Sequence, residues 1–238
     1  MFMGKPYGRR AGAGTPGVAE PFTGQQEEGT MDSKDRAGHL RRYWDRQSGS
    51  YDRQMAFMDR KFFGDTRSWI CGQARGDTLE VAVGTGLNLP LYPDDVRLTG
   101  VEWSPDMLDV ARRRASGLGL AADLREGDAQ ALDLPDAAFD TVVCTFSLCA
   151  IPDHRRALAE MVRVLRPGGT LLLADHVAGS AWPVRLAQRL LELVTVPMGG
   201  EHFLRRPILL LPEHGLTVER HDRFKLGLVE RLTARKPA

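Results

Sequence analysis

The sequence is poor in cysteine and has no long apolar run. Its 238 residues include three cysteines, Cys71, Cys144 and Cys149, which are too few and too badly spaced for a disulfide framework or a zinc site. We expect them to be reduced thiols, as in cytoplasmic proteins. No apolar run approaches the roughly 20 residues of a membrane-spanning helix, and the N-terminus lacks the compact apolar segment of a signal peptide. These absences predict a cytoplasmic protein without an integral membrane segment.

The chain also lacks an excess of charge of either sign. Its 32 basic and 31 acidic side chains leave a formal net charge of +1, and the two signs are mostly interleaved, as on a solvated surface. Such a balance gives no general electrostatic reason to expect a nucleic-acid partner. We therefore predict a small-molecule substrate and no nucleic acid, and the sequence leaves the oligomeric state open.

The length suits one well-buried α/β domain with attachments better than two domains. Residues 1–30 are rich in glycine and have no periodic apolar face, so they are predicted to form a disordered extension. Residues 31–238 are predicted to form the domain. Within it, residues 33–74 have helical apolar spacing and form a predicted cap. The cap either packs on the sheet edge or closes over a ligand with Tyr51 turned inward.

Short apolar segments alternate with helical ones after residue 78. A serine N-cap followed by a proline predicts that one helix begins at Ser104, and another is predicted over residues 155–165. The predicted strands cover residues 79–83, 97–102, 123–126, 139–144, 170–174, 216–226 and 228–234. The alternation predicts an α/β fold with a doubly wound seven-stranded sheet, mostly parallel, which an antiparallel hairpin completes at the C-terminal end.

Residues 177–215 interrupt this alternation and are predicted to be an insertion that covers the substrate. Within them, residues 182–196 form a predicted amphipathic helix with Leu186, Leu190 and Leu193 on one face. We favour core packing or cover for the active site as the use of that face. Contact with a membrane surface is the alternative, so peripheral membrane binding stays open.

A glycine turn follows the first predicted strand. Gly84 and Gly86 stand one residue apart there, and glycine lets ligand atoms approach the backbone closely. A dinucleotide-binding turn would carry a third glycine where this chain has Leu89, and a phosphate site would want a basic residue nearby. Glu102 closes the second strand, where a carboxylate can bind ribose hydroxyls, and Asp128 follows the third strand. The pattern favours a positively charged adenosine ligand.

Four segments resemble, in order, the motifs of the class I S-adenosylmethionine-dependent methyltransferases. They are EVAVGTG at residues 80–86, VEWSPDML at 101–108, GDA at 127–129 and RVLRPGG at 163–169. The resemblance covers roughly residues 40–175 and is specific, because all four motifs occur at the expected intervals. It implies a Rossmann-like fold with S-adenosyl-L-methionine as the cofactor. The subgroup it resembles contains ubiquinone/menaquinone C-methyltransferases, bacterial phospholipid N-methyltransferases and thiol methyltransferases.

The resemblance implies roles for the motif residues. Glu80 would face the methionine amino group, directly or through water, and Glu102 would hold the ribose hydroxyls. Trp103 would flank the adenine, with Asp128 on its amino group. Ala82 stands where the family usually has glycine, so its methyl group narrows the space beside the methionine moiety. The implied cofactor-binding residues are Glu80, Ala82, Gly84, Thr85, Gly86, Asn88, Glu102, Trp103, Met107, Asp128, Ala129 and Thr145.

The segment after the fourth predicted strand bears on the acceptor. Residues 145–153 read TFSLCAIPD, whereas methyltransferases acting on bases or glutamine commonly carry an Asn/Asp-Pro-Pro-Tyr/Phe loop there. This difference disfavours nucleic-acid bases and protein amides, and the apolar surroundings favour an apolar small molecule. The predicted substrate contacts are Tyr51, Phe146, Leu148 and His202.

Asp175 and His176 at the end of the fifth predicted strand are the candidate catalytic residues, because catalytic groups sit at the carboxyl ends of such strands. The alternative for His176 is a hydrogen-bonded structural role. Methyl transfer from a sulfonium needs mainly alignment and, for some acceptors, removal of a proton. We therefore expect direct in-line transfer to a thiol, an amine or an acidic hydroxyl, without a bound metal. A quinone-precursor C-methyltransferase and a non-catalytic cofactor-binding module are the alternatives.

Overall fold

The computed structural model describes residues 33–238, which form one compact unit, Ser33–Ala238. The extension predicted over residues 1–30 lies outside the described residues. Within residues 33–238, no helix has both the length and the apolar character that crossing a bilayer requires.

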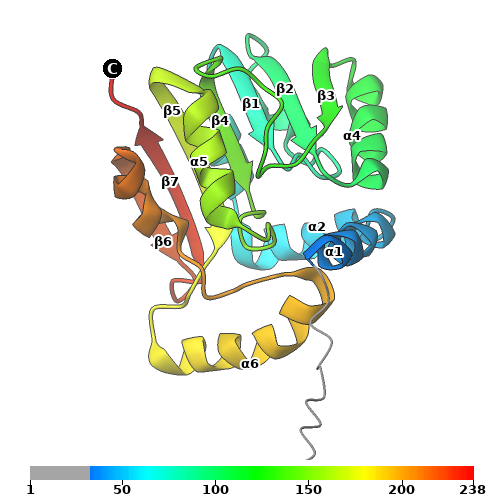
Figure 1. Cartoon of the computed structure of the whole chain (residues 1–238), viewed down its shortest axis with the longest axis vertical. Helices are drawn as coiled ribbons and strands as arrows, with labels where there is room; N and C mark the ends of the chain where they lie inside the picture. Colours follow the sequence, from blue (N-terminus) through cyan, green and yellow to red (C-terminus); the bar gives the residue numbers. More distant parts are fainter. Residues whose placement is uncertain (1–32) are drawn as a thin grey trace, which may run out of the picture. The chain divides into compact units, whose positions relative to one another are not determined.

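A seven-stranded sheet organises this unit (Figure 1). Its order is β3-β2-β1-β4-β5-β7-β6, and the five strands from β3 to β5 run parallel, whereas β7 pairs antiparallel with both β5 and β6. The strands are β1 (Asp77–Val81), β2 (Arg97–Glu102), β3 (Ala122–Glu126), β4 (Phe139–Thr145), β5 (Leu165–His176), β6 (Thr217–Phe224) and β7 (Val229–Arg235). The predicted fold class is confirmed: the fold is Rossmann-like, with an antiparallel C-terminal hairpin.

The direction of strand addition reverses between β1 and β4, which are neighbours in the sheet. The chain runs from β1 outward to β2 and β3 and then returns to add β4 on the other side. Ligands of open α/β sheets bind at such a reversal, outside the carboxyl ends of the strands. Figure 1 shows α1, α2 and α6 at the edge of the sheet where β1, β2 and β4 end. The glycine turn therefore lies beneath the N-terminal helices.

The N-terminal cap is helical, as predicted. It consists of α1 (Ser33–Gln47), α2 (Tyr51–Met58), the π-helical turn η1 (Asp59–Phe63) and α3 (Thr66–Cys71). Among the hydrogen bonds that fasten it to the rest of the domain, Thr85 Oγ1 donates to Asp52 Oδ1 at 2.6 Å, and Ser104 Oγ donates to Asp45 Oδ1 at 2.5 Å. Because both partners stand at the carboxyl ends of strands, the cap is held directly over the crevice.

Local signals set the starts of the two helices between the strands. Helix α4 (Pro105–Leu118) begins at the predicted position, where Ser104 Oγ accepts the Met107 N–H at 3.3 Å. Helix α5 (His154–Val164) is capped by Asp153, which accepts the Arg156 N–H at 3.0 Å. It lies one residue before the predicted range, within the usual uncertainty of helix ends.

Strands β1 and β5 differ most from the predicted ranges. Strand β1 ends at Val81, two residues early, because Ala82 has a φ of 58° and leaves the extended conformation. Strand β5 starts at Leu165, directly after α5, so residues 166–169, which precede the predicted strand, lie inside it. The pairing of β4 with β5 accommodates it through an irregular register between Phe139 and Thr141.

The C-terminal insertion contains α6 (Trp182–Gly199) and a 3-10 segment, η3 (Pro207–His214). We expected the apolar face of α6 to pack in the core or to cover the active site. Core packing is wrong: Leu190 is 60% exposed and Leu193 is 71% exposed. The physical reason is that the polar face of α6, not its apolar face, binds the rest of the domain.

Candidate functional site

The turn after β1 carries three residues with positive φ: 58° at Ala82, 57° at Gly84 and 79° at Gly86. A Cβ on Gly86 would lie 2.6 Å from Leu89 Cδ1 and 3.2 Å from Ala111 Cα. Only glycine fits there, so the turn packs tightly against the start of the next segment and α4. Ala82 adopts its left-handed conformation without that freedom, which costs roughly 1–2 kcal/mol.

Glu102 lies at the end of β2, beside the turn. Its carboxylate accepts the Gly84 N–H and the Ser104 N–H, both at 2.8 Å. The side chain is buried, and burial raises its pKa although these backbone donors lower it. The two donors fix the carboxylate at the cavity wall and leave lone pairs free for a ligand.

A narrow cavity runs from this carboxylate along the ends of β1, β2 and β3. Its wall includes seven of the expected cofactor-binding residues: Ala82, Gly84, Glu102, Trp103, Met107, Asp128 and Ala129. Asp128 is half-buried there and accepts the backbone and side-chain N–H groups of Gln130 at 2.8 and 2.9 Å. We name this space the first cavity. These seven residues span 47 positions of the sequence, from Ala82 to Ala129.

Glu80, on β1, lies behind the turn in a buried polar network. Its carboxylate accepts the Asn88 side-chain N–H at 2.7 Å and the Tyr92 hydroxyl at 2.9 Å. Asn88 Nδ2 also donates to Thr145 Oγ1 at 2.8 Å, and Arg67 donates to Asn88 Oδ1 at 3.1 Å. Sequence reasoning did not single out Arg67, because nothing in the pattern around α3 marks it. Thus three expected cofactor residues form one network that supports the turn.

Burial raises the pKa of Glu80 to about 7, although its hydrogen bonds with Tyr92 and Asn88 lower it. The folded-state pKa therefore lies above the ordinary value of 4.5, and the folded protein holds this proton more tightly than the unfolded chain. We expect the free energy of unfolding to fall as pH rises from about 4.5 to about 7, by on the order of 3 kcal/mol from this group.

Denaturant unfolding of the wild type and of Glu80→Gln, measured between pH 5 and pH 7.5, checks this expectation. The variant should lose less stability over that interval. Burial also raises the pKa values of Glu102, Asp175 and Glu201, so the difference between the two proteins, rather than either slope, isolates Glu80. Equal slopes would contradict the assignment.

A second cavity, of about 450 Å³, lies between the cap and the loop after α6. Its wall is mostly aromatic and apolar, with a few polar groups. The lining residues are Tyr43, Trp44, Gln47, Tyr51, Gln54, Met55, Phe57, Met58, Phe63, Phe146, His176, Glu201 and Phe203. Trp44, Tyr51 and Phe146 line the first cavity as well, so the two cavities meet at these three side chains.

Phe146 holds a strained backbone conformation at this junction. Its φ is 53°, which is rare for a bulky side chain. Its ring stacks on Phe63 at a centroid distance of 3.9 Å, and the Arg67 guanidinium lies 4.8 Å from the ring centroid. Strain of this kind persists where surrounding contacts enforce it and is common at functional sites. Tyr51, which lines both cavities with Phe146, has a pKa raised to about 12 by burial.

Besides the phenol groups of Tyr43 and Tyr51, the titratable side chains described along the second cavity are His176 and Glu201. The His176 ring stacks on Phe203 at 4.6 Å, and its Nδ1 is buried with no hydrogen-bond partner among residues 33–238. Burial raises the pKa of Glu201, and the nearby His176 lowers it. The geometry thus places one imidazole and one carboxyl group against an aromatic wall.

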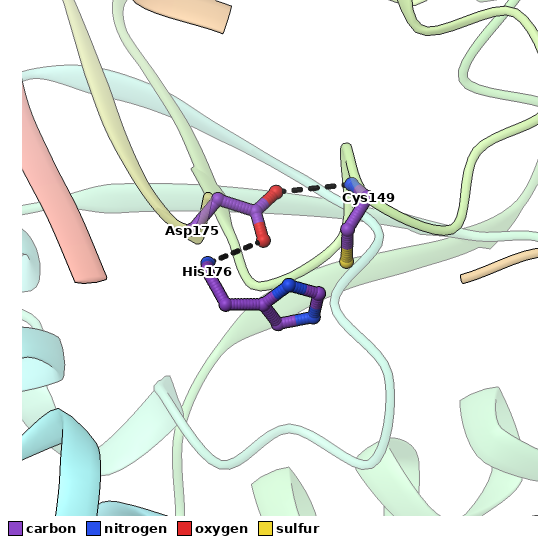
Figure 2. A group of neighbouring side chains, drawn as sticks. All are labelled: Cys149, Asp175 and His176. Atoms are coloured by element: carbon purple, nitrogen blue, oxygen red, sulfur yellow. Dashed lines mark hydrogen bonds between the residues drawn. The ribbon is translucent and has the colours of Figure 1, made fainter. Parts of the chain in front are cut away.

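Asp175 is buried, and its carboxylate binds backbone N–H groups. Figure 2 shows its two carboxylate oxygens accepting the Cys149 N–H at 3.0 Å and the His176 N–H at 2.8 Å. Within the described residues, the side chains of Cys149, Asp175 and His176 bring one possible metal-ligand atom each within 4.8 Å of one another, which the sequence spacing did not reveal. Burial raises the pKa values of both Cys149 and Asp175. Neutral groups are poor ligands, so the arrangement fits a fixed turn better than a metal site.

Two of the expected substrate residues lie outside both cavity walls. Leu148 is 2% exposed and belongs to the hydrophobic core. His202 is half-buried, and its backbone N–H donates to the Cys149 carbonyl at 2.9 Å. Its neighbours Glu201 and Phe203 line the second cavity instead. Glu201 was missed as a candidate, and its position in a glycine-rich loop beside a histidine was the available signal.

Comparison with known proteins identifies the family. A family model described as "Methyltransferase domain" matches residues 79–173, the stretch from β1 to β5 that builds the first cavity. Residues 79–173 form a class I S-adenosylmethionine-dependent methyltransferase domain. The family implies S-adenosylmethionine as the cofactor. The first cavity fits S-adenosylmethionine, because its wall offers a buried carboxylate, Glu102, that can accept ribose hydroxyls, and a glycine, Gly84, that lets a ligand approach the backbone.

Curated relatives of the methyltransferase domain differ in the acceptor that their names give. The chain is 42% identical over 118 residues to a phosphatidylethanolamine N-methyltransferase of Cereibacter sphaeroides (49% of this chain, 58% of the relative). It is 36% identical to a demethylmenaquinone methyltransferase of Deinococcus radiodurans (57% and 61%) and 32% identical to a human thiol S-methyltransferase (56% and 56%). The matched part thus spans little more than half the length of these relatives.

Solved structures support the fold. A methyltransferase of Thermotoga maritima, described as a possible histamine N-methyltransferase, superposes with a TM-score of 0.63 at 22% identity, over 82% of this chain and 99% of the other. A methyltransferase of Haloferax volcanii, in complex with its activator, gives a TM-score of 0.64 at 16% identity, over 82% and 98%. At such identities the likeness concerns the fold alone.

Replacing Ala82 by glycine is expected to stabilise the methyltransferase domain. Glycine removes the Cβ strain at a φ of 58°, and its greater freedom in the unfolded chain offsets part of the gain, which leaves about 0.5–1 kcal/mol. The midpoint of denaturant unfolding, at an unchanged slope, measures the effect.

Ala137→Gly is the matched control, because Ala137 has a φ of 50° and lies outside both cavity walls. We expect both variants to gain stability, and only Ala82→Gly to change the affinity for S-adenosylmethionine. A less stable Ala82→Gly protein would show that the surrounding turn, rather than the Cβ, sets the cost.

Proposed function

We propose that this domain transfers the methyl group of S-adenosylmethionine directly to an apolar small molecule bound in the second cavity, and that the acceptor atom is an amine nitrogen. The observation that carries the proposal is the meeting of the two cavities at Trp44, Tyr51 and Phe146. A cofactor in the first cavity and an acceptor in the second would approach each other there. Direct transfer requires this in-line alignment above all.

The walls of the second cavity favour an amine among the possible acceptors. Aromatic faces attract ammonium groups, and the attraction grows when water is excluded. Tyr43, Trp44 and Phe203 supply such faces, and Glu201 supplies a carboxyl group of the complementary charge. Methylation of an amine produces an ammonium ion, so the same walls would stabilise the charge that forms on the nitrogen during transfer.

The chain's own residues would have three tasks. The cap helices exclude water, the residues at the cavity junction align the acceptor, and His176 takes a proton from the acceptor ammonium so that the nitrogen has a free electron pair. S-adenosylmethionine, when bound, supplies the electrophilic sulfonium methyl group. The nitrogen–carbon bond forms as the carbon–sulfur bond breaks, and the sulfur keeps the electron pair of the broken bond. The His176 side chain lines the cavity, which supports this role for its imidazole.

A ring carbon of a quinone precursor is the second candidate acceptor. The demethylmenaquinone methyltransferases among the relatives support it, and an apolar cavity of about 450 Å³ suits a ring. A non-catalytic cofactor-binding module is the remaining alternative. An open apolar cavity that meets the first cavity favours an enzyme, whereas a module would be expected to have that space blocked.

Methyl transfer from labelled S-adenosylmethionine to a panel of amines, thiols, phenols and a demethylquinone tests the proposal. We expect the label on an apolar amine. Label on the demethylquinone alone would establish the ring-carbon alternative and overturn the amine assignment. Tight cofactor binding without transfer to any member of the panel would favour the module.

A further inference from the structure

Helix α6 is amphipathic, but its polar face lies against the protein and its apolar face points outward. Gln188 is buried on the inner face: its Nε2 donates to the Val177 carbonyl at 2.9 Å, and its Oε1 accepts the Gly179 N–H at 2.8 Å. Glu192, one turn later, accepts the Leu204 N–H at 2.8 Å. These bonds to fixed backbone groups set the rotation of the helix about its axis.

The opposite face carries large apolar side chains. At 100° per residue, positions 182, 186, 190 and 193 fall within one quarter of the helix circumference, and 194, 198 and 191 extend the same arc. These seven side chains are between 47% and 71% exposed: Trp182, Leu186, Leu190, Leu191, Leu193, Val194 and Met198. An exposed patch of this size on a single helix marks an interaction surface rather than an ordinary solvated face.

The β6–β7 turn extends this surface at the start of α6. The Ser180 N–H donates to the Leu226 carbonyl at 2.9 Å, which holds the turn beside the helix. Leu226 is 72% exposed, and the neighbouring Lys225 is exposed as well. We call the seven apolar side chains of α6 together with Leu226 the α6 surface.

The charges around the α6 surface decide between its possible occupants. The helix carries two cations, Arg185 and Arg189, and one acid, Glu192. The Glu192 carboxylate accepts a backbone N–H, and Arg185 donates to the Gly179 and Ser180 carbonyls while its side chain stays at the surface. Lys225 adds a third cation at the edge. A second copy of the chain would bring like charges together, whereas anionic lipid headgroups would complement them. Arginine and lysine can also extend toward headgroups while their stems stay in apolar surroundings.

We propose that the α6 surface docks on the surface of a bilayer that contains anionic phospholipids. The helix lies in the interface plane with its apolar face in the acyl boundary, as amphipathic helices with a wide apolar arc do. Glu201 and Phe203 follow α6 directly and line the second cavity, and a Cβ on Gly199 would contact the Tyr43 ring at 2.5 Å. The docking helix therefore ends at the wall of the cavity, next to where a membrane-dissolved acceptor would be bound.

Flotation of the purified chain with vesicles tests this proposal. The assay contains neither cofactor nor acceptor, so its result does not depend on the proposed catalytic function. The vesicles contain phosphatidylcholine alone or with phosphatidylglycerol. We expect binding to the mixed vesicles, at least a tenfold loss of binding in the Leu190→Glu/Leu193→Glu variant, and about a fivefold loss in Arg189→Gln, from roughly 1 kcal/mol per cation near an anionic surface.

Leu209→Glu is the matched control. Leu209 is 62% exposed, close to the 60% of Leu190. It lies on η3, before the start of β6, whereas the β6–β7 turn beside α6 follows the other end of that strand. We expect Leu209→Glu to bind vesicles like the wild type, and all variants to keep the wild-type thermal unfolding midpoint. A wild-type dimer that Leu190→Glu/Leu193→Glu converts to a monomer, without vesicle binding, would assign the surface to a second copy and overturn the proposal. Equal binding by this variant and the wild type would also overturn it.

Discussion

Replacement of Glu102 by alanine is expected to weaken S-adenosylmethionine binding by about 1.5–3 kcal/mol, or about 10- to 150-fold in Kd. The buried carboxylate is fixed by the Gly84 and Ser104 N–H groups at the wall of the first cavity. Removing it would take away the acceptors for the ribose hydroxyls and leave two backbone donors unpaired. Isothermal titration of the variant and of the wild type measures the change, and thermal unfolding separates it from lost stability.

Glu126→Ala is the control for this variant. Glu126 ends β3 directly beside Glu102 in the sheet register, but its side chain is half-exposed and pairs with Arg41. An ion pair at the surface contributes little, so the affinity of Glu126→Ala for S-adenosylmethionine should stay within about threefold of the wild-type value, a difference of under 1 kcal/mol. If Glu102→Ala also binds with unchanged affinity, Glu102 does not hold the ribose.

His176→Ala is expected to lower kcat for an amine acceptor by about 100-fold near neutral pH, with little change in the affinity for S-adenosylmethionine. General base catalysis contributes roughly 10²–10⁴-fold, and His176 is an imidazole that faces the second cavity. The deficit should shrink as pH rises, because the amine then loses its proton to solvent. A pH–rate profile of the variant therefore distinguishes proton removal from simple loss of packing on Phe203.

His202→Ala serves as the control, since His202 lies in the neighbouring loop but outside both cavity walls. Its kcat should match that of the wild type. If His176→Ala remains within about threefold of the wild type, a difference of under roughly 1 kcal/mol, His176 is structural and catalysis is alignment alone.

The sequence predicted only part of the buried network around Glu80, and it did not predict the backbone strain at Phe146. Two short motifs predicted the glycine turn together with Glu80 and Glu102. Such motifs can be recognised in a sequence because strand and turn preferences depend on neighbouring residues. The participation of Arg67 and Tyr92 around Glu80 was not predictable, since their contacts join segments without a shared pattern. The strain at Phe146 likewise follows from the Phe63 and Arg67 contacts rather than from local preference.

The sequence by itself determined the fold class and marked seven of the residues that line the first cavity. Strand β2 (Arg97–Glu102) and the Ser104 cap of α4 lie at the predicted positions, because apolar runs, turn glycines and caps act over a few residues. It also predicted Tyr51 and Phe146 as substrate contacts, which stays a prediction, and both side chains line the second cavity.

Only the tertiary structure decided which residues line the second cavity and which way α6 faces. The second cavity joins Tyr43 and Tyr51 of the cap to His176 and Glu201, more than 100 positions later, and no local pattern encodes such distant contacts. The apolar spacing of α6 correctly predicted an amphipathic helix. However, periodicity gives two faces without saying which one the protein covers. The hydrogen bonds of Gln188 and Glu192 to buried backbone groups turned the polar face inward, and that left the apolar face outside.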